Sequence, residues 1–176
     1  HIIDTYHFGA HDIDVGDIDY DGDYDILWGH VNGYRFGWFE NDGHQNFSFV
    51  EIDIDYDSIV SSQFWDMNHD KYPDILLTTE FPEELVLLIN LESDDFQRIT
   101  ISSFEMEIPK RPQAADLDDD GDIDIVNAYF SEQNDFVWWE NDGSFNFTMR
   151  IIEPFFNQVL KNFLTDLNGD NRVDIV

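Results

Sequence analysis

The sequence feature that most constrains the fold is a repeat of about fifty residues, marked by an aspartate-rich loop. Each loop carries an oxygen-bearing side chain at positions 1, 3, 5 and 9 and runs into Ile-Leu or Ile-Val. The four loops begin at Asp17, Asp66, Asp116 and Asp166, so they are 49, 50 and 50 residues apart. A fixed period of this length is typical of propellers and solenoids, whose units bury their hydrophobic faces only against neighbouring units.

A second landmark keeps the same period. The segment Trp-Phe-Glu-Asn-Asp-Gly at 38–43 returns as Trp-Trp-Glu-Asn-Asp-Gly at 138–143, and the apolar run 86–90 fills the same slot between them. Short apolar or alternating runs closed by Asp-Gly turns favour strands. Each unit therefore predicts four short strands, which in the third unit lie at 111–115, 123–130, 136–140 and 147–152.

These patterns predict an all-β protein made of four-stranded antiparallel β-propeller blades. Several strands are apolar on both faces, so each sheet must be covered on both sides. The expected units are 10–56, 57–106, 107–156 and a partial unit 157–176, and residues 1–9 would supply the last strand of a preceding blade. That makes about three and a half blades over 1–176, and we expect a segment of a seven-bladed ring in a longer chain, with a processed or trimmed start at His1.

Charge excludes some classes of partner. Asp and Glu number 39 against 8 Lys and Arg, which gives a formal charge of −31. Binding to nucleic acid or to anionic lipid needs a basic surface, so we expect neither. Hydrophobic residues make up 42% and aromatic residues 16%, which indicates a folded core rather than an acidic disordered chain. No apolar run is long enough to predict insertion into a membrane.

The loops predict calcium sites, one in each loop and up to four in all. Ca²⁺ takes six to eight oxygen ligands, so side chains at positions 1, 3, 5 and 9 with the carbonyl of position 7 can wrap one ion. Position 6 must turn sharply, which suits Gly or Asn. The predicted ligands are Asp17, Asp19, Asp21, Asp23 and Asp25; Asp66, Asn68, Asp70, Tyr72 and Asp74; Asp116, Asp118, Asp120, Asp122 and Asp124; and Asp166, Asn168, Asp170, Arg172 and Asp174.

The sequence disfavours the alternatives to calcium. A solvated acidic turn explains one such loop, but not four in phase with oxygen at every odd position. The helix–loop–helix calcium motif needs a Glu at position 12, where Trp28, Leu77 and Asn127 stand here, and Mg²⁺ demands a more rigid octahedron. In loop two Lys71 replaces Gly at position 6, so we expect weaker binding there.

The loop Asp-x-Asp-x-Asp-Gly-x-x-Asp, the strand after it and the Trp-Phe-Glu-Asn-Asp-Gly turn resemble the FG-GAP/VCBS repeat family over essentially the whole chain. The resemblance implies a β-propeller like the integrin α-subunit head, with Ca²⁺ between the first two strands of a blade. It also implies an extracellular or cell-surface location and a role in adhesion, glycan binding or scaffolding.

The main functional hypothesis is therefore a non-catalytic, secreted, calcium-binding module that binds a glycan or protein ligand at the cell surface, beside further blades of the same chain or other copies. The alternatives are a domain of a larger secreted enzyme, such as a polysaccharide lyase, and a subunit of an extracellular filament. No hydrolase elbow, phosphate loop or zinc-protease motif occurs. Asn46 and Asn146 begin N-glycosylation sequons, which predicts a glycoprotein. The alternating aspartates 12, 14, 53, 55 and 57 indicate strand edges.

Overall fold

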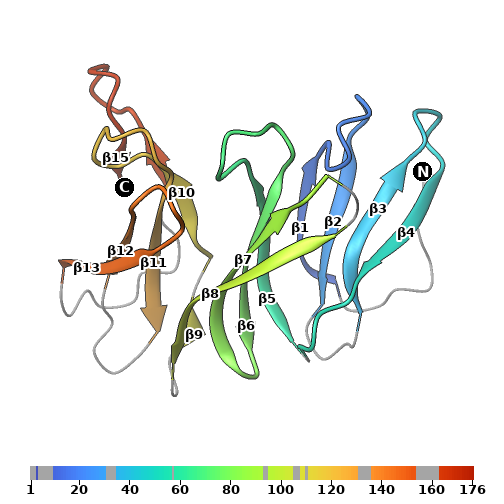
Figure 1. The fold of residues 1–176 in the computed structure, drawn as a ribbon, viewed down its shortest axis with the longest axis horizontal. Coiled ribbons are helices and arrows are strands. Elements are labelled where there is room, and N and C mark those ends of the chain that lie inside the picture. The colour runs from blue at the N-terminus through green and yellow to red at the C-terminus, as the bar shows by residue number, and fades with distance from the viewer. Residues whose placement is uncertain are drawn as a thin grey trace.

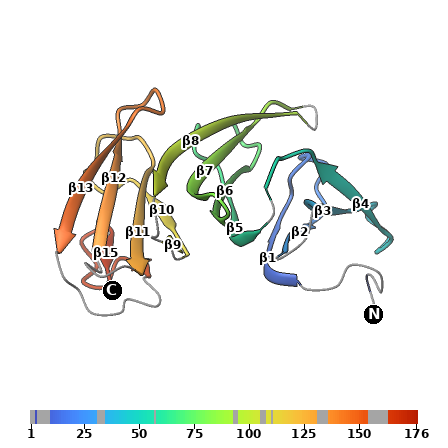
Figure 2. The ribbon, with the colours of Figure 1, turned by 90° about the horizontal axis from the view of Figure 1, so that it is seen from below.

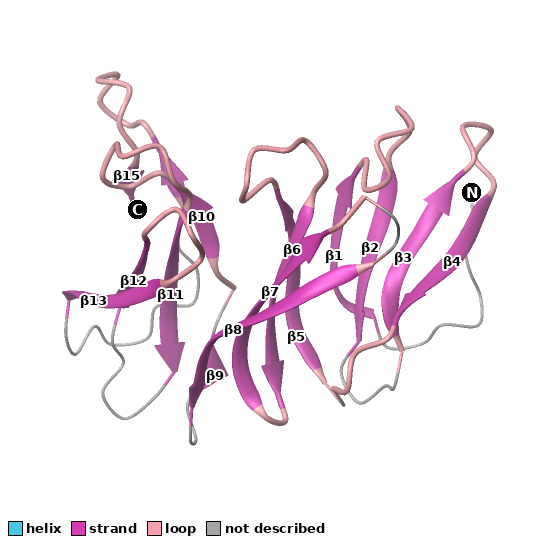
Figure 3. Cartoon of the chain, in the orientation of Figure 1, coloured by secondary structure: helices cyan, strands magenta, loops and turns pink. Residues whose placement is uncertain are grey.

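A computed structural model describes residues 3, 10–30, 35–56, 58–92, 95–104, 108–109, 111–130, 136–153 and 163–176. Throughout this described part the secondary structure consists of strands, with no helix (Figure 3). No helix able to cross a bilayer is found there either. The predicted strand within residues 1–9 falls outside the described residues, except for Ile3, which is not in a strand.

The strands form successive antiparallel sheets in chain order. The first sheet contains β1 (Ala10–Gly16), β2 (Asp25–His30), β3 (Phe36–Asn41) and β4 (Phe47–Ile52). The second contains β5 (Ile59–Trp65), β6 (Asp74–Glu80), β7 (Glu83–Asn90) and β8 (Phe96–Phe104). The third contains β10 (Gln113–Ala115), β11 (Asp124–Phe130), β12 (Phe136–Asn141) and β13 (Phe147–Glu153), and β9 (Ile108–Pro109) also pairs with β11. β14 (Leu164–Thr165) pairs with β15 (Asp174–Ile175).

The predicted all-β class and the four-strand pattern are confirmed. In the third sheet the four predicted strands agree with β10 to β13 to within two residues at each end. Asp12 and Asp14 lie in β1, as predicted. The same prediction is wrong for Asp53 and Asp55, because the chain leaves the sheet after Ile52 and crosses to the next one there; Asp57 lies outside the described residues.

Two hydrophobic clusters fill the spaces between consecutive sheets. Alternate residues of β6 and β7 point to opposite faces, so Leu77 and Leu88 pack toward the first sheet while Leu76 and Leu87 pack toward the third. Trp38 and Trp139 are buried in these two clusters, respectively. The second sheet is thus covered on both sides, as its uninterrupted apolar run predicts.

The sheets are arranged as a fan. β1, β5 and β10 lie toward the inside of the arc, while β4, β8 and β13 lie toward its outside (Figure 2). The aspartate-rich loops, each joining the first two strands of a sheet, all emerge at the same edge of the fan (Figure 1). This arrangement places the predicted metal ligands in a row along one rim.

Candidate metal centre

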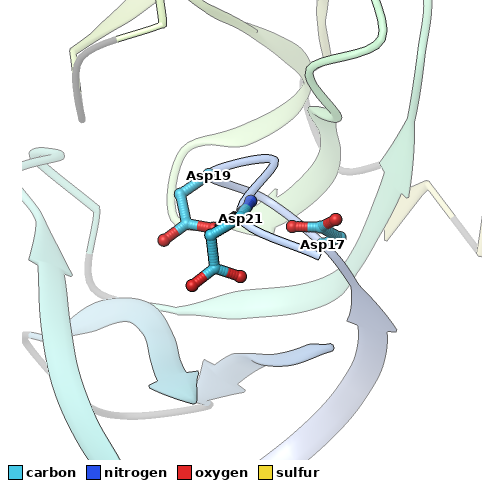
Figure 4. Close-up of side chains that lie close together, drawn as sticks. All are labelled: Asp17, Asp19 and Asp21. Carbon is cyan, nitrogen blue, oxygen red and sulfur yellow. Dashed lines mark hydrogen bonds between the residues drawn. The ribbon is translucent and has the colours of Figure 1, made fainter. Parts of the chain in front are cut away.

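Three carboxylates of loop one converge at the tip of the turn. Oxygens of Asp17, Asp19 and Asp21 lie within 4.8 Å of one another, close enough for a single cation to contact all three (Figure 4). Asp116, Asp118 and Asp120 form the same cluster in loop three. In both loops the first aspartate is half-buried and the other two are exposed, so the cluster opens to solvent. Oxygen-only ligands of this kind suit a hard cation such as Ca²⁺.

The loop backbone holds these side chains by a repeated set of hydrogen bonds. In loop one Asp21 N donates to Asp19 Oδ1 at 3.1 Å, Gly22 N to Asp17 Oδ2 at 3.1 Å, and Asp23 N to Asp21 Oδ1 at 2.9 Å. Donors at positions 5, 6 and 7 bond in the same way in the other three loops. Each carboxylate is therefore oriented by the chain that follows it.

Two residues in every loop have left-handed backbone. Position 6 has φ between 67° and 98° in the four loops, held by Gly22, Lys71, Gly121 and Asn171. Position 4 is also left-handed, with φ of 61° at Tyr20 and 64° at Asp119. The sequence predicts the first of these turns from its Gly and Asn residues, whereas at position 4 only loop four has a glycine, Gly169.

The aspartate at position 9 is bonded differently from the other three. Asp25 Oδ2 accepts Ile18 N at 3.0 Å, and its Oδ1 accepts Asn41 N on β3 at 2.9 Å. Asp74 and Asp124 make the same pair of bonds, and Asp174 accepts Leu167 N at 2.9 Å. The structure does not group these carboxylates with the converging three, so their predicted role as ligands stays a prediction. In the structure, their hydrogen bonds connect position 2 of the loop to the start of the following strand. In the first three sheets they also connect it to the end of β3, β7 or β12.

The asparagine that ends the third strand of a sheet is a site residue that the sequence analysis did not assign. Asn41, Asn90 and Asn141 each donate their backbone N–H to the position-9 carboxylate and their side-chain amide to the carbonyl before it. Their Oδ1 atoms accept N–H groups of the following turn. Their spacing of 49 and 51 residues, close to the loop spacing of 49 and 50, was the available signal.

Buried carboxylate oxygens support a cation in loops one and two. Asp17 Oδ1 and Asp66 Oδ1 are both buried and have no hydrogen-bond partner among the residues that the structure describes. Leaving a charged acceptor buried and unpaired is costly, and a cation would satisfy it. In loop one burial, together with the neighbouring charges of Asp21 and Asp17, raises the pKa of Asp19 above its ordinary value. Slight desolvation of the carboxylate and the charge of Asp120 raise the pKa of Asp118 in loop three. The residues present therefore fit the ion that the resemblance implies.

Loops two and four are less concentrated in negative charge. Asn68 and Asn168 replace a carboxylate at position 3, and Asn68 Nδ2 donates to Asp70 Oδ2 at 2.7 Å. Asp166 has a lowered pKa, because the N–H groups of Asn171 and Gly169 donate to it. The position-7 residues donate their N–H to position 5 in all four loops, which keeps Asp23, Tyr72, Asp122 and Arg172 beside the clusters. Ligation by their carbonyls stays a prediction.

The two sequon asparagines take part in the Asp-Gly turn. Asn46 and Asn146 are exposed, and each donates its side-chain amide to an oxygen of Asp42 or Asp142 at 2.8 and 2.9 Å. These bonds give both asparagines a structural role in the turn. Attachment of a glycan to the same nitrogens stays a prediction.

The fold and the row of loops define a protein class. The four-stranded antiparallel sheets follow one another in the chain, and their first strands all lie on the inside of one arc (Figure 2). Sheets arranged in this way, with their acidic loops on one rim, are β-propeller blades. The family resemblance is confirmed over the last third of the chain: residues 116–176 match the FG-GAP-like repeat.

A solved structure shares this fold. It is described as the basis of specific recognition of non-reducing terminal N-acetylglucosamine by a lectin of Agrocybe aegerita. The similarity has a TM-score of 0.67 at 18% sequence identity and covers 96% of this chain but 47% of the lectin chain. This chain thus spans about half the length of its structural relative. No curated protein sequence matches the chain.

Proposed function

We propose that the protein is a calcium-binding β-propeller module that binds carbohydrate outside the cell and has no catalytic activity of its own. Calcium would be structural. It would be held by the carboxylates at positions 1, 3 and 5 of each loop, with positions 7 and 9 completing the shell. Bound there, it neutralises the repulsion between carboxylates at the rim and stabilises the turn between the first two strands.

The observation that carries the calcium proposal is the buried, unpartnered oxygen of Asp17 beside two converging carboxylates. A solvated acidic turn would leave all its oxygens to water. Here one oxygen is closed off from water and receives no donor from the described part of the chain, although its neighbours on the loop are bonded. The equivalent oxygen of Asp66 repeats the arrangement one sheet further on.

Carbohydrate binding is supported by the fold shared with a lectin that recognises N-acetylglucosamine. The FG-GAP-like repeat points the same way, since the family resemblance implies adhesion or glycan binding. The strongly negative charge of the chain disfavours acidic glycans, because they would be repelled. A neutral glycan is therefore the proposed ligand.

The calcium proposal is tested by thermal melting in excess Ca²⁺ and in excess EGTA. We expect a clearly higher melting temperature with calcium, because an ion that binds only the folded state stabilises it. The double variant Asp19→Asn, Asp118→Asn should lose much of that rise. The control is Asp55→Asn, because Asp55 is an exposed aspartate outside the loops. This variant removes one negative charge away from the carboxylate clusters, so it should retain the full rise in melting temperature with calcium. Identical melting curves in both solutions would overturn the proposal.

A further inference from the structure

A half-open cavity of about 290 Å³ lies where the first strands of the sheets approach one another. Its volume is at the lower end of the range of roughly 300–1,000 Å³ that is usual for small-molecule sites. The residues that line it come from all four sheets, although they are far apart in the sequence. They include Asp14 on β1, Gln63 and Trp65 on β5, Arg111 and Gln113 at the start of the third sheet, and Phe163 beside β14.

Gln63 is the reason to regard this cavity as a binding site. The residue is only 5% exposed, and its Oε1 accepts Trp65 Nε1 and Gln113 Nε2, both at 3.2 Å. Because both partners are donors, they fix which end of the amide carries the oxygen. The Nε2 end is then buried, and no described residue offers it an acceptor. An unpaired buried N–H is costly, so a ligand oxygen at this point would be stabilising.

Side chains of both positive and negative charge lie around the cavity. Arg111 Nη2 lies 3.4 Å from Asp12 Oδ1, so a cation from the third sheet meets a carboxylate from the first. Asp14 Oδ2 accepts Phe64 N at 2.9 Å, and a carboxylate has capacity for further donors. An anion would meet Asp14 and the negative field of the whole chain, while a free cation would meet Arg111. A neutral ligand with hydroxyl groups avoids both conflicts.

Aromatic side chains complete the lining. Trp65 and Phe163 both line the cavity, and Phe163 is 60% exposed, so its ring is accessible to a ligand. Aromatic rings bury apolar C–H groups well, and a few polar groups among them fix the orientation of a ligand. A pyranose offers this combination, because it has C–H groups on its faces and hydroxyls around its edge.

We propose that this cavity binds one neutral sugar unit. The ring of the sugar packs against Trp65 and Phe163, one of its oxygens accepts Gln63 Nε2, and its hydroxyls donate to Asp14. The inference rests on the proposed carbohydrate-binding function and adds to it the location and the class of sugar. It also assigns the site to the first strands of the sheets rather than to the calcium rim.

The experiment measures binding of methyl glycosides of glucose, galactose, mannose and N-acetylglucosamine, with glucuronate as the acidic comparator, by calorimetry in calcium. We expect a neutral glycoside to bind and glucuronate not to bind. Phe163→Ala and Gln63→Leu should each weaken the binding about tenfold, through lost ring contact and lost hydrogen bonding. Phe163 is exposed, so its replacement leaves the core intact even if Gln63→Leu does not fold.

The matched control is Ile151→Ala. Ile151 is 54% exposed, lies on β13 at the outside of the arc and does not line the cavity, so its replacement should leave the affinity unchanged. If wild-type protein binds a glycoside and both cavity variants bind it equally well, this inference is wrong while the proposed function stands. If no glycoside binds the wild-type protein, both are overturned.

Discussion

Asn90 Nδ2, at the end of β7 in the second sheet, donates to the carbonyl of Ile18 in loop one of the first sheet, at 3.0 Å. The same amide also donates to Pro73 O, and Asn90 Oδ1 accepts Glu92 N at 3.0 Å. One buried side chain therefore connects the acidic loop of one sheet to the loop and turn of the next. The hydrogen bonds of Asn41 that are recorded here all stay within its own sheet.

We predict that Asn90→Ala lowers the free energy of unfolding by about 2–3 kcal/mol, since several buried groups lose a partner at once. Asn41→Ala should cost less, because its bonds are more exposed and do not cross between sheets. Urea unfolding of both variants in calcium measures the difference. Equal losses for the two variants would show that the bond between sheets contributes nothing.

Lys71 is the only non-glycine, non-asparagine residue at position 6 of the four loops, and its φ is 84°. Left-handed backbone costs an ordinary side chain roughly 1 kcal/mol that glycine avoids. We predict that Lys71→Gly stabilises the protein by about this amount. It should also tighten calcium binding in loop two, because it removes a positive charge that repels the ion. Asn171→Gly, in loop four, should give a smaller gain because Asn tolerates this conformation better. Calcium titration and urea unfolding test both; a destabilised Lys71→Gly protein would contradict the argument.

The sequence predicted the features that repeat in phase and missed those that depend on pairing between distant segments. The strands of the third sheet and the left-handed residues at position 6 follow from short-range signals, namely apolar runs and turn residues. The bond from Asn41 to Asp25 depends on how β3 pairs with β2, and no local pattern gives that register. The predicted strand edge at Asp53 and Asp55 failed because alternation alone does not show where a sheet ends.

The cavity at the inside of the fan was not predicted from the sequence, although several of its lining residues stand at the same position of successive repeats. Gln63 and Gln113 are one repeat period of fifty residues apart, each three residues before the first aspartate of its loop, and they bond to each other. Their meeting depends on the curvature with which successive sheets are placed. That curvature comes from the packing of the two hydrophobic clusters rather than from any single segment.

Lowering the pH should stabilise the metal-free protein and destabilise the calcium-bound protein. Burial raises the pKa of Asp25 and Asp74 from 3.8 to about 6, against the lowering effect of their backbone hydrogen bonds. A group whose folded pKa is raised stabilises the fold at low pH, and this contribution is lost as pH rises through about 6. Metal-free protein should therefore melt at a higher temperature at pH 5 than at pH 7.5.

With calcium bound the order should reverse, because the ion needs ionised carboxylates and binds less well as they take up protons. Melting in EGTA and in excess Ca²⁺ at the two pH values measures both trends. Parallel pH dependence in the two solutions would contradict the coupling between these aspartates and the ion.

Substitutions of Gly143 and Gly121 distinguish two ways in which an added side chain destabilises loop three, namely backbone strain and a steric clash. Gly143 has φ of 77° in the Asp-Gly turn, and a Cβ there would lie 2.5 Å from Asp122 Oδ2. Gly121 has φ of 97°, but a Cβ there would have no atom within 4 Å. We predict that Gly121→Ala costs about 1–2 kcal/mol from backbone strain alone. Gly143→Ala should cost more, because the added methyl also displaces Asp122. It should weaken calcium binding too, since the N–H of Asp122 helps to orient Asp120. Urea unfolding with calcium titration of both variants measures this, and equal effects would show that the contact with Asp122 is unimportant.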